Sequence, residues 1–452
     1  MQRPSVFASN PTLARPAARL GKAAGWAAVV ALVAGGWHPQ AHANGFQVRT
    51  GSPDWSANAF AGMAAKGYDA STAWSNPAAM VRLDSNEIDL GINGLFPTIE
   101  FSGQNKLGGG QVSGSSGGNA GQAAMTPSLE AVWSVSHDLK LGLSVEAPFG
   151  QRTVYPGNFV GRYQAEVSSI SDIEIGLSAA YRVTPTLSIG GGPIIDYFGA
   201  RLTSAINIGP TATLTGDPAV DIHGTNWSAG YHLGVFWEPT DTWRFGVDYR
   251  SRITQTINGT QQVFIPPLLA ALSPPTAAGL SAALNTPART QITLPDVATL
   301  SSVWQITPSL AALATLQWTH WSVLQALTVI GANGSSSSLP LHFNDSWMGS
   351  LGANYRPEFW PKLLLQGGVG LDQSPVSNAY RTPRLPNPAE ALIGLGATYE
   401  LIPGLNLQAA YLHEFSFGDS QISYSSRSTA GTLVGSYKTQ VDVASLGLAW
   451  RF

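Results

Sequence analysis

The sequence predicts an all-β protein: a transmembrane antiparallel β-barrel of about 14 strands, preceded by a segment without strand character. Three observations support this fold class. Only 11% of the 452 residues are charged, whereas about 25% is usual in soluble domains. Aromatic residues are frequent, with 14 Trp. After residue 44 no run of about 20 apolar residues offers a spanning helix, which leaves strands as the membrane-crossing element.

The first 43 residues have the pattern of a secretory signal peptide. Basic residues precede an apolar run at 23–36, and Ala41-His42-Ala43 provides a small-x-small cleavage site. The run is too short to cross a bilayer, which argues against the alternative of an N-terminal membrane anchor. We therefore expect residues 1–43 to be removed after export and the mature chain to begin at Asn44.

Long segments alternate between apolar and polar residues, as barrel strands do. In 227–237 one face is formed by Trp227, Ala229, Tyr231, Leu233, Val235 and Trp237. Segments 243–250 and 405–417 repeat the pattern. Lipid on one side of the wall and a lumen on the other require such alternation, with aromatic residues at both interfaces. The alternative, a soluble β-sandwich, predicts shorter strands and more exposed Lys and Glu.

Turn chemistry sets the strand number. Short turns with Pro, Asp or Gly are expected at 137–140, 183–186, 238–243, 307–309, 356–361 and 401–404. Longer loops are expected near 104–126, 150–165, 204–226, 258–290, 331–341, 373–389 and 418–436. This regular alternation gives an even number of strands, as outer-membrane barrels have. The last residue, Phe452, ends a period-2 apolar pattern that resembles the C-terminal signal of such barrels.

Residues 44–84 precede the first strand and do not alternate. A barrel of this size encloses more space than its side chains fill. We therefore expect 44–84 to form a hatch, or plug, inside the lumen of a barrel formed by 85–452. The chain has no Cys, which excludes disulfides and thiolate metal sites, and its net charge of −3 gives no indication of nucleic-acid binding.

Residues 44–80, "NGFQVRTGSPDWSANAFAGMAAKGYDASTAWSNPAAM", resemble the N-terminal hatch of the FadL family, transporters of long-chain fatty acids and other hydrophobic compounds. The matching motifs are Gly45-Phe46-Gln47, Ala61-Gly62, Asp69-Ala70-Ser71 and Asn76-Pro77-Ala78. Downstream, 147–155, 245–253, 294–322 and 367–376 also resemble family motifs. The resemblance therefore covers the whole mature chain.

The resemblance implies passive uptake of long-chain fatty acids or aromatic hydrocarbons through a plugged barrel, with a lateral exit at a kinked strand. The hatch residues it singles out are Phe46, Asn76, Pro77 and Ala78, and the gate residues are Pro148, Phe149 and Gly150. Pro lacks an N–H and interrupts a strand ladder; alternatively, Pro148 only ends a strand. We expect Asn76-Pro77-Ala78 to pack against the kink and pair with its freed backbone groups.

An apolar loop and four arginines are candidate substrate contacts. Segment 264–285 is nearly uncharged, and its capture residues would be Phe264, Ile265, Leu268, Leu269 and Leu272. The alternative is that the loop packs on itself as a cap. Possible carboxylate contacts are Arg152, Arg162, Arg250 and Arg381. The alternative is that these arginines pair with lumen acids such as Asp248 or Glu414. Because Glu390 follows Arg384 where fatty-acid members often carry a basic residue, aromatic hydrocarbons stay open as substrates.

Three other classes of outer-membrane barrel are alternatives. A diffusion porin should carry rows of charge in its lumen and no plug. A lipid enzyme would need a Ser–His arrangement that only geometry can reveal, and an adhesin or structural barrel would transport nothing. We expect no enzyme activity, catalytic residue, metal or cofactor. The expected partners are a hydrophobic small molecule, outer-membrane lipid and lipopolysaccharide, and the barrel-assembly machinery during biogenesis. We expect no nucleic acid as a partner and a monomeric protein.

Overall fold

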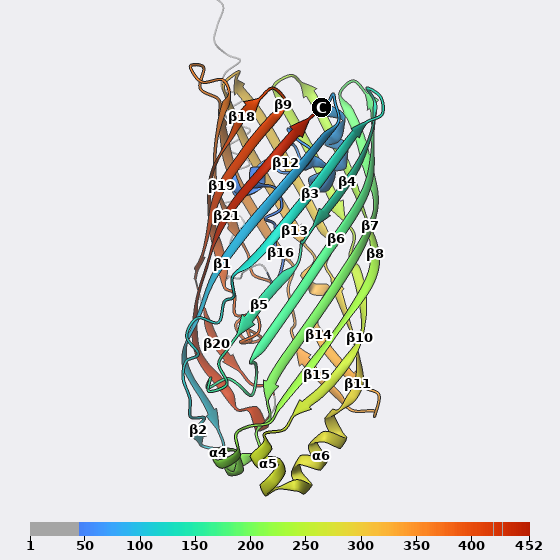
Figure 1. The fold of residues 1–452 in the computed structure, drawn as a ribbon. Coiled ribbons are helices and arrows are strands. Elements are labelled where there is room, and N and C mark those ends of the chain that lie inside the picture. Colours follow the sequence, from blue (N-terminus) through green and yellow to red (C-terminus); the bar gives the residue numbers. More distant parts are fainter. Residues whose placement is uncertain (1–44, 419, 427) are drawn as a thin grey trace, which may run out of the picture. The chain divides into compact units, whose positions relative to one another are not determined.

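The computed structural model describes residues 45–418, 420–426 and 428–452, so the predicted signal peptide lies outside the described residues. Within them, antiparallel strands form one closed sheet (Figure 1). The first strand, β1 (Glu87–Leu107), pairs with the last, β21 (Thr432–Arg451), from Glu87↔Arg451 to Lys106↔Thr432. This seam closes the barrel and excludes the alternative of a β-sandwich.

The barrel has 14 strands, as predicted. Six further strands are continuous: β3 (Ala124–Ser134), β6 (Val167–Thr184), β7 (Leu187–Ala205), β8 (Ala219–Thr240), β17 (Leu363–Asp372) and β18 (Ala389–Ile402). Six are interrupted and consist of two segments each: β4 (Leu139–Glu146) with β5 (Gly150–Val154), β9 (Trp243–Arg250) with β10 (Ile253–Phe264), β11 (Thr286–Leu294) with β12 (Val297–Thr307), β13 (Leu310–Thr319) with β14 (Ala326–Gly331), β15 (Ser336–Pro340) with β16 (Ser346–Tyr355), and β19 (Leu405–Phe417) with β20 (Gln421–Tyr424). A short β2 (Gly110–Gln111) folds back on the tip of β1.

The six predicted short turns all connect neighbouring strands, but several of the long loops were predicted too long. The loop expected at 258–290 is only 265–285, because β10 continues to Phe264 and β11 begins at Thr286. Likewise, β8 begins at Ala219, inside the loop expected at 204–226. These strand ends carry Thr, Gln, Asn and Gly instead of an apolar face, so they lack the alternation by which membrane strands are recognised.

The outer face of the barrel is apolar. Trp227, Tyr231, Leu233, Val235 and Trp237 of β8 are all exposed, whereas His232 and Phe236 between them are buried. The indole rings of Trp243 and Trp304 stack with centroids 5.3 Å apart, at the end of the barrel where the short turns lie. The predicted division of strand 227–237 into two faces is therefore confirmed. Among the described residues, no helix is long and apolar enough to cross a membrane.

Residues 45–86, the N-terminal segment, contain three short helical turns: α2 (Pro53–Ala57), α3 (Thr72–Ser75) and η1 (Pro77–Arg82). Local sequence explains two of them, because Ser52 and Asn76 accept hydrogen bonds from the first turns that follow and Pro occupies the first helical position in each. α2 contacts β17, β18, β19, β21 and β1, whereas η1 contacts β4, β6, β7 and β8. Strands from most of the wall thus surround the segment, and nearly all its residues are buried.

The remaining helices lie in the connections. They are η2 (Gly209–Thr211), α4 (Ala212–Thr215), α5 (Pro267–Leu272), α6 (Pro274–Leu284), η3 (Trp321–Val323) and η4 (Ser428–Ala430). Figure 1 shows α4, α5 and α6 together at one end of the barrel, opposite the end that carries the short turns and the C-terminus. In outer-membrane barrels short turns face the periplasm and long loops face outward, so these helices cover the outer mouth.

Candidate functional site

The wall of the barrel is interrupted at Ala147-Pro148-Phe149, between β4 and β5; we call this the strand break. β3 pairs with β4 only up to Leu129↔Val145. Beyond the break β5 pairs with β6, and its one other contact of this kind is a single bridge, Gly121↔Thr153. In the described residues, the ladder between the second and third barrel strands therefore stops at Val145, beside the imino acid that cannot donate to it.

Phe46, Gln47 and Val48 occupy the inner side of the strand break. The Val48 N–H donates to the Pro148 carbonyl at 2.7 Å, and the Gly150 N–H donates to the Phe46 carbonyl at 2.9 Å. Gln47 and Phe149 thereby form an antiparallel bridge. The start of the N-terminal segment thus satisfies backbone groups that the missing ladder leaves free.

The predicted contact between Asn76 and the kink is wrong. The Asn76 side-chain amide donates to the Ala64 carbonyl at 2.8 Å and to the Val235 carbonyl of β8 at 3.0 Å. Glycines at two positions of the wall leave room for Asn76 and Ala78. A Cβ at Gly234 would lie 2.1 Å from Asn76 Oδ1, and a Cβ at Gly190 would lie 2.6 Å from the Ala78 nitrogen. Asn76-Pro77-Ala78 therefore packs on β7 and β8, not on the break. Of the predicted hatch residues, Phe46 is the one at the break.

The interior beside the strand break is apolar; we call it the apolar chamber. Phe46 packs against Phe149 and Trp321, with ring centroids 5.8 and 4.9 Å apart. The buried residues that line the chamber are Phe46, Phe149, Ile194, Phe198, Ile253, Ile257, Ile292, Leu294, Trp321, Leu324, Leu341, Phe343, Val376 and Leu385. Phe198, Ile257 and Ile292 also line an adjoining, almost wholly apolar cavity of about 60 Å³. Because Phe46 and Phe149 belong to both features, the chamber reaches the break.

A small pocket whose lining combines apolar and charged side chains, the break pocket, lies at the same place. Its lining includes Gln47, Trp74, Pro148, Phe149, Glu174, Asp248 and Arg250. Arg250 forms an ion pair with Glu174 and donates to the Trp74 carbonyl at 2.8 Å. Its guanidinium lies 4.3 Å from the centroid of the Trp74 ring. The pocket therefore sets a buried cation beside the break.

The four predicted carboxylate contacts are not brought together. Arg162 pairs with Asp217 at 2.8 Å in the loops. Arg381 is buried and donates to the Gln421 carbonyl at 2.6 Å, and Arg152 is exposed on β5. The alternative that an arginine pairs with a lumen acid holds for Arg250, but its partner is Glu174 and not Asp248 or Glu414. Of the four, only Arg250 lines the break pocket.

The predicted capture residues divide between the surface and the interior of the outer mouth. Leu269 of α5 is fully buried, whereas Phe264, Leu268 and Leu272 are exposed to 67%, 47% and 63%. Leu214 of α4, a helix that contacts α5, is 75% exposed. The loop thus packs on itself through Leu269 and still presents an apolar surface to water.

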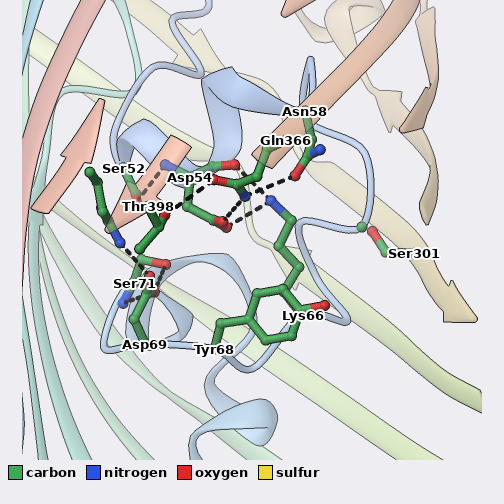
Figure 2. A network of polar contacts seen from close by, with 12 residues as sticks. Ser52, Asp54, Asn58, Lys66, Tyr68, Asp69, Ser71, Ser301, Gln366 and Thr398 are labelled. Atoms are coloured by element: carbon green, nitrogen blue, oxygen red, sulfur yellow. Dashed lines mark hydrogen bonds and ion pairs between the residues drawn. The ribbon is translucent and has the colours of Figure 1, made fainter. Parts of the chain in front are cut away.

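A buried polar network attaches the N-terminal segment to the opposite wall (Figure 2). Lys66 Nζ lies 2.7 Å from Asp54 Oδ2, and both side chains are almost fully buried. Gln366 of β17 donates to Asp54 Oδ1 at 2.5 Å, and Gln408 of β19 donates to Asp69 Oδ2 at 2.9 Å. One contact lies within the N-terminal segment and two join it to β17 and β19. Because these groups are buried, loss of one partner would lower the stability of the fold.

Sequence reasoning missed Gln47 and Val48 as partners of the break. Phe46 and Val48 do alternate with Gln47, which is a strand signal, but three residues are too few for that pattern to be read. The chamber residues Phe343, Val376 and Leu385 were missed as well, because they lie in connections where no periodic pattern marks an inward side.

The chain is similar in sequence to known outer-membrane proteins. A family model described as outer membrane protein transport protein (OMPP1/FadL/TodX) matches residues 33–452. Outer membrane protein P1 of Haemophilus influenzae is 26% identical over 86% of this chain and 88% of its own length. The long-chain fatty acid transport protein of Escherichia coli O6:H1 is 24% identical over 85% of this chain and 91% of its own length.

Among solved structures, a Pseudomonas aeruginosa FadL homologue is similar with a TM-score of 0.83 and 25% identity, covering 90% of this chain and all of that one (100%). The toluene transporter TbuX of Ralstonia pickettii has a TM-score of 0.63 and 18% identity, covering 89% and 98% of the two chains. At that identity the second likeness concerns the fold alone.

Proposed function

Because the chain belongs to the OMPP1/FadL/TodX family of outer-membrane transport proteins, we propose that it takes up long-chain fatty acids by passive transport. Members of this family are transporters of hydrophobic compounds rather than enzymes. The observation that carries the proposal is the meeting of the apolar chamber with the strand break. A diffusion porin keeps a polar, water-filled lumen, whereas the chamber that reaches the strand break here is lined mainly by Phe, Ile and Leu.

The proposed route has three stages. A hydrophobic molecule adsorbs on the exposed apolar surface of Phe264, Leu268 and Leu272 at the outer mouth. It then partitions into the apolar chamber. It leaves sideways at Pro148-Phe149-Gly150, where the ladder to β3 is missing, and enters the lipid without crossing the polar network beneath.

We propose in addition that residues 44–84 act as a plug and that 85–452 form the barrel proper. Burial of the N-terminal segment and its contacts with strands around the wall support this division. A plug leaves the lateral break as the way out and limits the leak of ions. It also places Phe46 in the path of the substrate, between the chamber and the break.

One observation favours a fatty acid over an aromatic hydrocarbon. The break pocket holds Arg250, a cation paired with Glu174, which a substrate carboxylate would approach on leaving the chamber. A hydrocarbon has no charged group that could interact with that cation.

Uptake of labelled oleate and labelled toluene, measured side by side, tests the proposal. The cells would lack their own hydrophobic-compound transporters and express this chain, with an empty vector as the control. We expect uptake of oleate well above the control and little uptake of toluene. Uptake of toluene alone would transfer the proposal to hydrocarbons, and uptake of neither by correctly folded protein would refute it.

A further inference from the structure

Four buried carboxyl groups inside the barrel lie in a row, the carboxyl file: Asp69, Asp89, Glu130 and Glu146. All are at least 94% buried, with exposures of 6%, 2%, 0% and 6%. Asp89 of β1 and Glu130 of β3 are directly opposite in the ladder. Asp69 lies within hydrogen-bonding reach of Asp89, and Glu130 within reach of Glu146. The file therefore crosses from the N-terminal segment through β1 and β3 to β4.

These contacts require protons. An ionised carboxylate only accepts hydrogen bonds, so two carboxyl groups bond to one another only when a proton lies between them. Both oxygens of Asp89, both of Glu130 and Oε1 of Glu146 have no donor among the described residues. Burial, and then the nearby Asp54 carboxylate, raise the pKa of Asp69 at the start of the row. Shared protons thus satisfy groups that no ion pair neutralises.

One end of the file meets water. Asp69 lines a cavity of about 390 Å³ at the short-turn end of the barrel, together with Asp54 and Gln408. Arg356, Lys362 and Arg451, which also line it, are exposed, so the cavity opens to the periplasmic side. Asp69 and its neighbours in the N-terminal segment are visible in Figure 2.

The other end of the file meets the strand break. Glu146 is the last residue of β4, directly before Ala147-Pro148-Phe149. Glu146 is paired in register with Glu174, which lines the break pocket and forms the ion pair with Arg250. The charged groups that face Glu146 are therefore Glu130, Glu174 and Arg250.

We propose that the carboxyl file is a proton relay that delivers a proton to the carboxylate of a departing substrate at the strand break. The inference rests on the proposed function, because it concerns how an acid leaves through that exit. A carboxylate in hydrocarbon is very costly, whereas the neutral acid partitions readily. A transporter that releases an acid sideways into lipid therefore gains from a source of protons at its exit.

The step conserves atoms and charge. The O–H bond of the Glu146 carboxylic acid breaks as an O–H bond forms on the substrate carboxylate, and Glu146 is left ionised. Glu130, Asp89 and Asp69 each pass one proton along, and water in the periplasmic cavity reprotonates Asp69. Nothing is oxidised or reduced, and one proton moves from the periplasm to each molecule of acid released.

Glu130→Gln interrupts the relay with nearly the same shape, because an amide donates a hydrogen bond but does not pass on a proton. The probes are labelled oleate and labelled oleyl alcohol, which share a chain and differ in the ionisable group. We expect oleate uptake to fall about tenfold or more, since a positioned proton-transfer group contributes about 100-fold or more to a step, while uptake of the alcohol is unchanged. Lowering the external pH should restore much of the oleate uptake, because the acid then arrives neutral.

Two variants serve as controls. Glu130→Asp keeps a carboxyl group and should retain most oleate uptake. Glu390→Gln alters a buried glutamate of β18 outside the file and should leave the ratio of oleate to alcohol uptake unchanged. An equal loss for both probes in Glu130→Gln would mean a structural role, and no loss for oleate would exclude the relay. If wild-type protein carries neither probe, the proposed function fails instead, so the two failures are distinguishable.

Discussion

At the scale of single residues, Asn76 shows how a short polar side chain holds the N-terminal segment in place. Its amide nitrogen donates to two carbonyls, one in the segment and one in β8, and its oxygen accepts from the Ala78 N–H. The glycines at 234 and 246 provide the space for it. Asn76 thus connects the segment to itself and to the wall through one side chain.

Asn76→Ala should therefore destabilise the folded protein by about 1–3 kcal/mol, since one buried and one partly buried carbonyl lose their donor. Thermal unfolding of the purified protein in detergent, followed by circular dichroism, measures this. Asn76→Asp is the matched comparison: it keeps the acceptor for Ala78 but sets a carboxylate oxygen against the same two carbonyls, so it should be at least as unstable as the Ala variant. If the Ala variant were as stable as wild type, Asn76 would not anchor the segment.

At the scale of elements, a short β-pairing covers the inner side of the strand break and joins residues 46–48 to residues 148–150, about a hundred residues away in the chain. Pro148 and Gly150 drew attention to the third strand from the sequence alone, because neither residue favours a regular ladder. The sequence did not predict that residues 46–48 pair with the break. Three residues are too few to show a period, and their pairing depends on how the rest of the N-terminal segment is positioned. The six short turns were predictable because Pro, Asp and Gly act locally.

A disulfide across the break tests whether it must open. Gln47 and Phe149 face each other between the flanking bonds of Val48 to Pro148 and Gly150 to Phe46, so they form a non-hydrogen-bonded pair. The Cα atoms of such pairs lie about 4.5 Å apart, which suits a disulfide. Since the chain has no Cys, Gln47→Cys with Phe149→Cys introduces the sole pair.

Oxidation of this double variant should abolish oleate uptake, and a reductant should restore it. Each single Cys variant, treated with the same oxidant, controls for loss of the native side chain. Full uptake by the oxidised protein, with the crosslink verified by mass spectrometry, would show that substrate leaves elsewhere.

At the scale of the whole molecule, apolar residues cover the outside of the barrel and also fill the chamber within. The alternation in 227–237 predicts the outer face, and the low charge of the chain agrees with both surfaces. The chamber itself was not predictable, because Trp321, Phe343 and Leu385 come from connections that gather only in the folded chain. Periodicity reports which residues face lipid but does not report what loops bring together.

Ion conductance in planar bilayers tests the arrangement as a whole. If the N-terminal segment acts as the proposed plug, the wild-type protein should conduct almost no current, because α2, α3 and η1 contact strands around the wall. Deletion of residues 45–84 should produce open channels of porin-like conductance, provided that the barrel still assembles. High conductance of the wild-type protein would contradict the plug and favour a diffusion porin.

The seam between β1 and β21 also constrains how the protein reaches its membrane. Nearly the whole length of β1 pairs with the strand that is synthesised last. Until β21 arrives, β1 has an open edge of N–H and C=O groups that hydrocarbon cannot solvate. Contacts between such distant parts of a chain form slowly. Insertion is therefore expected to be all-or-none: a partly made barrel has no stable place in lipid and must be shielded until its two ends meet.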